Sequence, residues 1–154
     1  MPELRPGMLA RGLARLSEQG AARAREGLEL LAEAVVEQAR TNASNGSHAY
    51  GTPTPARPGE GPATISETLR DSVTHSDPLP NAAGWSLKVG PTVGRYPPYG
   101  GGRTPADRYG YYLETGLRNG DTYPWLKPAA DTIAAGSALA VFSGAVNRGW
   151  GQLF

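Results

Sequence analysis

The side chains of this sequence that could transfer a proton are few and scattered. The candidate acids and bases are His48, His75, Asp107, Glu114, Asp121 and Asp131. The two histidines are far apart, and neither occurs in a His-x-x-x-His or His-Glu-x-x-His pattern that binds zinc. There is no Gly-x-Ser-x-Gly nucleophile elbow and no cysteine. We therefore predict no catalytic residue, no metal site and no cofactor.

If the chain is an enzyme, Glu114 is the candidate for its catalytic acid. The alternative is that Glu114 caps a helix or forms an ion pair between subunits near a helix C-terminus, and the sequence favours this alternative.

Arginines suggest a second kind of chemistry, contact with nucleic acid. Five of them lie in or near the irregular middle of the chain: Arg57, Arg95, Arg103, Arg108 and Arg118. If the loops converge, these arginines form a local basic patch although the whole chain has a net charge of only +1. No recognition-helix or zinc motif is present, so we expect at most nonspecific contact. Arg57, Arg95 and Arg103 are the predicted contacts to DNA or to a neighbouring protein.

The densest pattern lies between Arg108 and Asp131 and positions Glu114. It predicts an aromatic helix that ends at Gly116, a polar turn at 119–121, an extended piece at 122–125 and a last helix started by Pro128. One face of the aromatic helix is expected to carry Tyr109, Tyr112, Leu113 and Gly116, with Glu114 off that face.

This stretch resembles the neck or tail-completion proteins of long-tailed bacteriophages. The resemblance rests on Tyr-x-x-Tyr-Leu-Glu-x-Gly at 109–116 and Tyr-Pro-Trp-Leu-Lys-Pro-Ala at 123–129. The family usually has Thr after the glycine, whereas this chain has Leu117. The structural or interface residues that the resemblance implies are Tyr109, Tyr112, Leu113, Glu114, Gly116, Tyr123, Pro124, Trp125, Leu126 and Pro128.

The resemblance implies a structural virion protein at the head–tail junction, assembled in the host cytoplasm as a sixfold or twelvefold ring. Its partners would be other copies of itself, adjacent neck, terminator or tail-tube proteins, and DNA passing through the lumen, with no membrane contact. Within the same class, a tail terminator or a head-side adaptor or stopper stays open. Outside it stand a small hydrolase and a nonspecific DNA-binding protein.

The element pattern predicts a single α+β domain of 154 residues. A long helix is expected at 8–41, a loop at 42–63, an α+β body at 64–131 and a C-terminal helix at 128–148. The two helices should pack on a small antiparallel sheet, a hairpin of strands near 72–76 and 85–89 with a turn at 77–84. Thr64 and Glu67 fit a capping box for a short helix.

Composition sets limits on this core. The chain has 21 glycines and 14 prolines, far above average usage, so long loops are expected at 42–63 and 90–105. The first loop should be mobile or ordered by a partner. No apolar run reaches about 18 residues, so no membrane span is expected. The N-terminal helix, roughly 45 Å long, exceeds what its own core needs. It has an apolar stripe through Leu16, Leu28, Leu31, Val35 and Ala39, and it packs either on its own sheet or partly on a neighbour.

Overall fold

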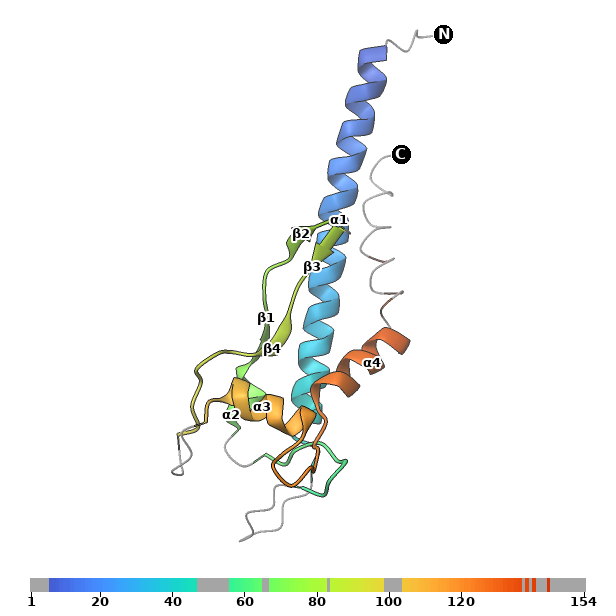
Figure 1. Cartoon of the computed structure of the whole chain (residues 1–154). Coiled ribbons are helices and arrows are strands. Elements are labelled where there is room, and N and C mark those ends of the chain that lie inside the picture. The colour runs from blue at the N-terminus through green and yellow to red at the C-terminus, as the bar shows by residue number, and fades with distance from the viewer. Residues whose placement is uncertain are drawn as a thin grey trace.

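The chain is an α+β protein built on one long helix, as predicted (Figure 1). The computed structural model describes residues 6–46, 56–64, 67–82, 84–98 and 104–136, with 138, 140 and 144. The elements in order are α1 (Pro6–Asn42), α2 (Thr68–Ser72), β1 (Val73–His75), β2 (Leu79–Asn81), β3 (Gly84–Ser86), β4 (Val89–Pro91), α3 (Ala106–Thr115) and α4 (Leu126–Gly136).

Helix α1 has two unlike halves. In the C-terminal half the buried positions are Gly27, Ala32, Val36 and Ala39, continued by Ala43 just after the helix. The predicted stripe coincides with this face at Ala39, whereas its members Leu28, Leu31 and Val35 are only half-buried. Alanines face the core because their small side chains let other segments approach the helix axis. In the N-terminal half every described side chain from 14 to 22 is exposed, and the helix extends past the strands beside it (Figure 1).

The strands form one interrupted hairpin rather than a hairpin with a wide turn. β1 pairs antiparallel with β4, and β2 pairs antiparallel with β3. Between the two ladders the Ser76 amide donates to the Lys88 carbonyl (2.9 Å), but the Lys88 amide donates to the Ser76 hydroxyl (3.0 Å). The side chain thus replaces a ladder acceptor and separates the two sheets. The predicted turn at 77–84 is wrong, because β2 occupies it and Pro80 pairs with Trp85. A two-stranded ribbon tolerates proline because each strand has a free edge.

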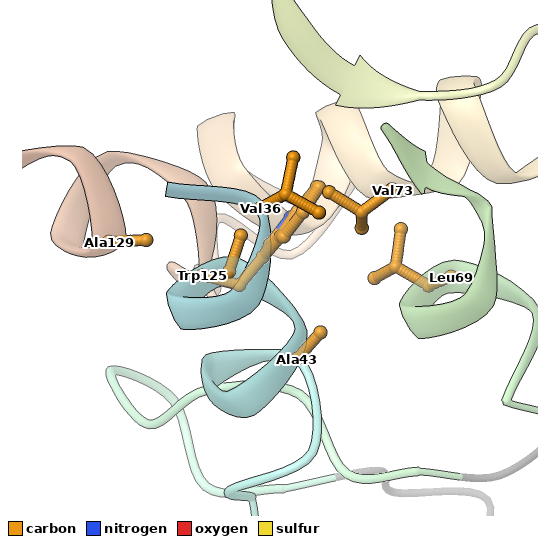
Figure 2. Close-up of a cluster of buried hydrophobic side chains, with 7 residues drawn as sticks. Val36, Ala43, Leu69, Val73, Trp125 and Ala129 are labelled. Atoms are coloured by element: carbon orange, nitrogen blue, oxygen red, sulfur yellow. The ribbon is translucent and has the colours of Figure 1, made fainter. Parts of the chain in front are cut away.

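The core lies where the end of α1 meets α2, β1 and the start of α4. Figure 2 shows Val36, Leu69, Val73, Trp125 and Ala129 converging from these segments. α4 packs against α1, so the C-terminal helix joins the core across α1. Trp125 is the largest side chain in the described core that is fully buried.

Helix α2 begins later than the capping box predicted. It starts at Thr68, and its preceding residue Glu67 has a left-handed φ of 59° and makes no side-chain cap. The capping-box prediction is therefore wrong. Glu67 instead accepts the Asp71 amide through its carbonyl (2.8 Å) and pairs its carboxylate with Arg70 (2.9 Å).

The first glycine- and proline-rich loop packs on its own chain where the structure describes it. Ala56, Pro62 and Ala63 are buried, and the Gly46 amide donates to the Pro62 carbonyl (3.4 Å). At Gly46 an added Cβ would lie 2.0 Å from the Gly61 carbonyl oxygen, so the two segments touch through their backbones. Glycine and alanine allow this close backbone packing at residues 56–64. That the loop is mobile or ordered by a partner stays a prediction.

Candidate functional site

Glu114 joins α3 to α4 by capping the start of α4. Its Oε2 accepts the amides of Trp125 (2.9 Å) and Leu126 (3.0 Å), and its Oε1 accepts the amide of Lys127 (2.9 Å). A helix N-terminus has unsatisfied amides and a partial positive charge, and a carboxylate stabilises both. Both oxygens are thus used as acceptors. Capping was the predicted role, but the helix that Glu114 caps is the following one.

This cap also explains where α4 begins. The sequence predicted a start at Pro128, whereas α4 starts two residues earlier, at Leu126. Proline within the first turn is compatible with either start because it needs no amide there. The carboxylate of Glu114 satisfies the amides at 125–127, so the helix can extend back to Leu126.

Trp125 holds three segments together from the core. Its side chain is 1% exposed, and its indole Nε1 donates to the Gly110 carbonyl of α3 (3.1 Å). Its own carbonyl accepts Nδ2 of Asn42, the last residue of α1 (3.0 Å). Gln38, one turn earlier, donates to Oδ1 of Asn42 (3.0 Å) and so orients that side chain. We call Gly110, Glu114, Trp125 and Asn42 the joint.

The turn between α3 and α4 follows the prediction closely. α3 ends at Thr115, and Gly116 has φ 129°, a conformation that favours glycine. The Leu117 amide donates to the Asp121 carbonyl (2.9 Å), and the Asp121 amide donates to Oδ1 of Asn119 (3.1 Å). The chain then returns to α3, where the Tyr123 amide donates to the Leu113 carbonyl (2.7 Å).

The predicted structural residues are brought together, with one exception. Tyr109, Leu113 and Leu126 pack against the core, Tyr123 and Trp125 are buried, and Pro124 and Pro128 are half-buried. Tyr112 was predicted on the face of Tyr109 and is instead 48% exposed, edge-on to Tyr111 at 6.0 Å between ring centroids. The packed face turns toward Gly110, because a glycine lets the Trp125 ring approach α3.

Gly110 and Asn42 are the joint residues that sequence reasoning missed. A glycine inside an otherwise aromatic helix indicates that another segment packs closely against the helix. The sequence contains this signal at Gly110. No local signal connects Asn42 to a residue 83 positions away.

The predicted contact arginines do not form one cluster with the joint. Arg57 is exposed in the loop whose Gly59 amide donates to the Thr122 carbonyl (2.8 Å). Arg95 is exposed near Asp71, and Arg103 lies outside the described residues. Their contact with DNA or a neighbour stays a prediction.

The other candidate acids and bases have local roles. Asp107 accepts the Gly94 amide through Oδ1 (3.0 Å), Asp121 accepts an Asn119 amide hydrogen (2.6 Å), and His75 lies near its neighbour's carbonyl. Asp131 pairs with Lys127, which raises the pKa of that lysine. His48 lies outside the described residues. Among the residues that the structure describes, no three acidic or histidine side chains are grouped to hold a metal.

Arg70 and Asp71 form the other perturbed pair. The hydrogen bond from Arg70 lowers the pKa of Asp71. The pKa of Arg70 is raised by its hydrogen bond to Asp71 and, to a smaller extent, by its hydrogen bond to Glu67. Because the Asp71 pKa is lowered on folding, the pair's stabilisation is present above the ordinary aspartate pKa. It is lost as the pH falls through the lowered, folded-state value.

Substituting Gly110 with alanine is expected to destabilise the protein by about 1–3 kcal/mol, because overpacking forces side chains to shift. The added Cβ would lie 2.8 Å from Leu69 Cδ1 and 3.3 Å from Trp125 Cζ2. Urea unfolding followed by circular dichroism measures the change. Gly20→Ala is the matched control. Beyond its own stretch of helix, its added Cβ meets nothing within 4 Å, so helix propensity should make it neutral or stabilising by up to about 1 kcal/mol. Equal effects at the two positions would contradict the close packing at Gly110.

Comparison with protein-family models, curated proteins and solved structures finds no match to this chain. In the described part of the chain, no helix is both long and apolar enough to cross a lipid bilayer.

Proposed function

We propose that this protein is a structural subunit of the head–tail connector of a tailed bacteriophage, joining the tail to the DNA-filled head as part of an oligomeric ring. The observation that carries the proposal is the joint. The two segments that resemble the neck and tail-completion proteins, 109–116 and 123–129, lie on α3 and α4 and are linked through Glu114 and Trp125. The resemblance therefore falls on residues that position elements of this fold.

The mechanism is the formation of an interface and involves no turnover. The joint fixes α4 on α1 and sets the body from which other surfaces project. Two exposed features suit contact with neighbours: the Tyr111–Tyr112 pair on α3 and the N-terminal half of α1. Tyrosine is enriched at protein interfaces because it has a large apolar ring and a polar tip. Helices in proteins gain most of their stability from packing against other segments. For the part of α1 that extends beyond its own core, a neighbouring subunit would supply that packing.

A nonsense mutation in the gene tests this proposal in the phage that encodes it. Lysates of the mutant should contain DNA-filled heads and complete tails that are not joined, counted by negative-stain electron microscopy. Adding the purified protein should restore joined particles and infectivity. Normal particles in the mutant lysate, or empty heads with no free tails, would contradict a role at the junction.

A further inference from the structure

Helix α1 carries opposite charges on its two halves. Residues 6–25, the basic segment, hold four arginines and one glutamate, a formal charge of +3. Residues 26–42, the acidic segment, hold four glutamates and one arginine, a formal charge of −3. Such a helix presents complementary surfaces to a second copy of itself.

Many of these charges near the centre of the helix are already paired within the chain. Arg23 pairs with Glu26 at 2.7 Å and Arg25 with Glu29 at 3.1 Å, and Arg25 also lies 5.9 Å from the ring centroid of Trp85. By contrast, Arg11, Arg15 and Glu18 are exposed and form no ion pair with any residue that the structure describes. They stand on one helical face, since they follow one another at i, i+4 and i+7.

A groove beside the acidic segment has the complementary charges. It lies between α1 and β1, has a volume of about 340 Å³, and is lined by Glu33, Val36, Glu37, Arg40, Thr74 and His75. Its charged residues on α1 are Glu33, Glu37 and Arg40, again at i, i+4 and i+7. Glu37 and Arg40 pair with each other at 2.7 Å, whereas Glu33 is exposed and in no ion pair with a described residue.

The two charge triplets match in sign when two helices run in the same direction. Arg11 then faces Glu33, Arg15 faces Glu37, and Glu18 faces Arg40, with one helix displaced by 22 positions, roughly 33 Å. In the antiparallel arrangement Arg11 would face Arg40 and Glu18 would face Glu33, which places like charges together at two of three positions. The pattern therefore selects the parallel, staggered pairing.

We propose that the face formed by Arg11, Arg15 and Glu18 of one copy docks in the groove lined by Glu33, Glu37 and Arg40 of the next copy. The contact is heterologous, so its repetition gives a closed ring or an open filament. The inference deepens the proposed function, because it names the contact between ring neighbours. Its test uses the purified chain alone, so its failure is separable from failure of the connector role.

Charge reversal followed by rescue tests the contact. The segment variant is Arg11→Glu with Arg15→Glu, the groove variant is Glu33→Arg with Glu37→Arg, and the third variant combines all four. Sedimentation velocity between about 1 and 100 μM, in low salt and in 0.5 M NaCl, measures assembly. The wild type should form oligomers that salt weakens. Each reversal should weaken self-association more than about tenfold, and the combination should restore it in low salt.

Two controls keep the result interpretable. Arg118→Glu makes a charge change on the exposed turn between α3 and α4 and should leave assembly unchanged. Circular dichroism in 0.5 M NaCl, where assembly of the wild type is also weakened, should show wild-type helicity in every variant, since the substituted positions are exposed. If the groove variant loses helicity, the segment variant and the salt dependence of the wild type still test the contact.

The inference is overturned if the wild type stays monomeric at 100 μM in low salt, or if the segment variant assembles as well as the wild type. It is also overturned if the combined variant is folded but monomeric. A segment variant that keeps the oligomer and loses retention by duplex DNA would assign the basic segment to nucleic acid instead.

Discussion

Replacing Glu114 with alanine should lower the free energy of unfolding by about 2–4 kcal/mol, since three hydrogen bonds to a charged group at a helix N-terminus are lost together. The amides of Trp125, Leu126 and Lys127 would lose their shared acceptor. Glu114→Gln should cost about 1–2 kcal/mol. The side-chain NH₂ group of glutamine is a donor, and it would replace a carboxylate oxygen that accepts a backbone amide in the wild type. Urea unfolding monitored by circular dichroism measures both losses.

Asp77→Ala is the control for this pair of variants. Asp77 is exposed between β1 and β2 and caps no helix, so the change should stay within about 0.5 kcal/mol. The order of stability should be wild type, Gln variant, Ala variant. A Glu114→Ala protein as stable as the wild type would contradict the capping role and reopen Glu114 as a catalytic acid.

Replacing Trp125 with alanine should destabilise the protein by about 3–5 kcal/mol, the range for removing a large buried aromatic side chain. Trp125 is 1% exposed, and its ring lies within the cluster of Val36, Leu69 and Val73. In a domain of this size such a loss is a large fraction of the total stability. We expect a partly or wholly unfolded chain that does not assemble, measured by thermal unfolding and by sedimentation.

Two further substitutions separate packing from hydrogen bonding at this position. Trp125→Phe keeps most of the apolar volume and removes the bond from Nε1 to the Gly110 carbonyl, so about 1–3 kcal/mol should be lost. Trp85 on β3 is only half-buried, so Trp85→Ala should cost less than Trp125→Ala because less of its surface is buried. A folded Trp125→Ala protein that assembles normally would show that the joint is not central to the fold.

Local patterns predicted the elements that depend on local physics. The apolar period predicted α1 to within two residues of its N-terminus, and the Gly116 stop and the Asn119–Gly120 turn were also predicted correctly. In each case neighbouring residues decide the backbone conformation. For Glu114 the sequence left two structural roles open, a helix cap or an ion pair between subunits, and the hydrogen bonds to 125–127 show a cap.

The errors concern backbone conformations and contacts that local patterns do not determine. The capping box failed because Glu67 takes a left-handed conformation and α2 begins only at Thr68, a choice that local sequence does not reveal. The hairpin turn was misplaced because Pro80 argued against a strand that a free ribbon edge permits. Two features depend on how α3, α4 and α1 pack: the identity of the helix that Glu114 caps, and the bond from Asn42 to Trp125. No fixed spacing in the sequence predicts contacts of this kind.

Gold-labelled electron microscopy of intact phage particles, with an antibody against this protein, tests the central claim most directly. The proposed connector role predicts label at one place on each particle, the point where the tail meets the head. Label along the tail or at its tip, or particles without any label, would contradict a connector subunit. Unlabelled particles would also return the hydrolase and DNA-binding alternatives to first consideration.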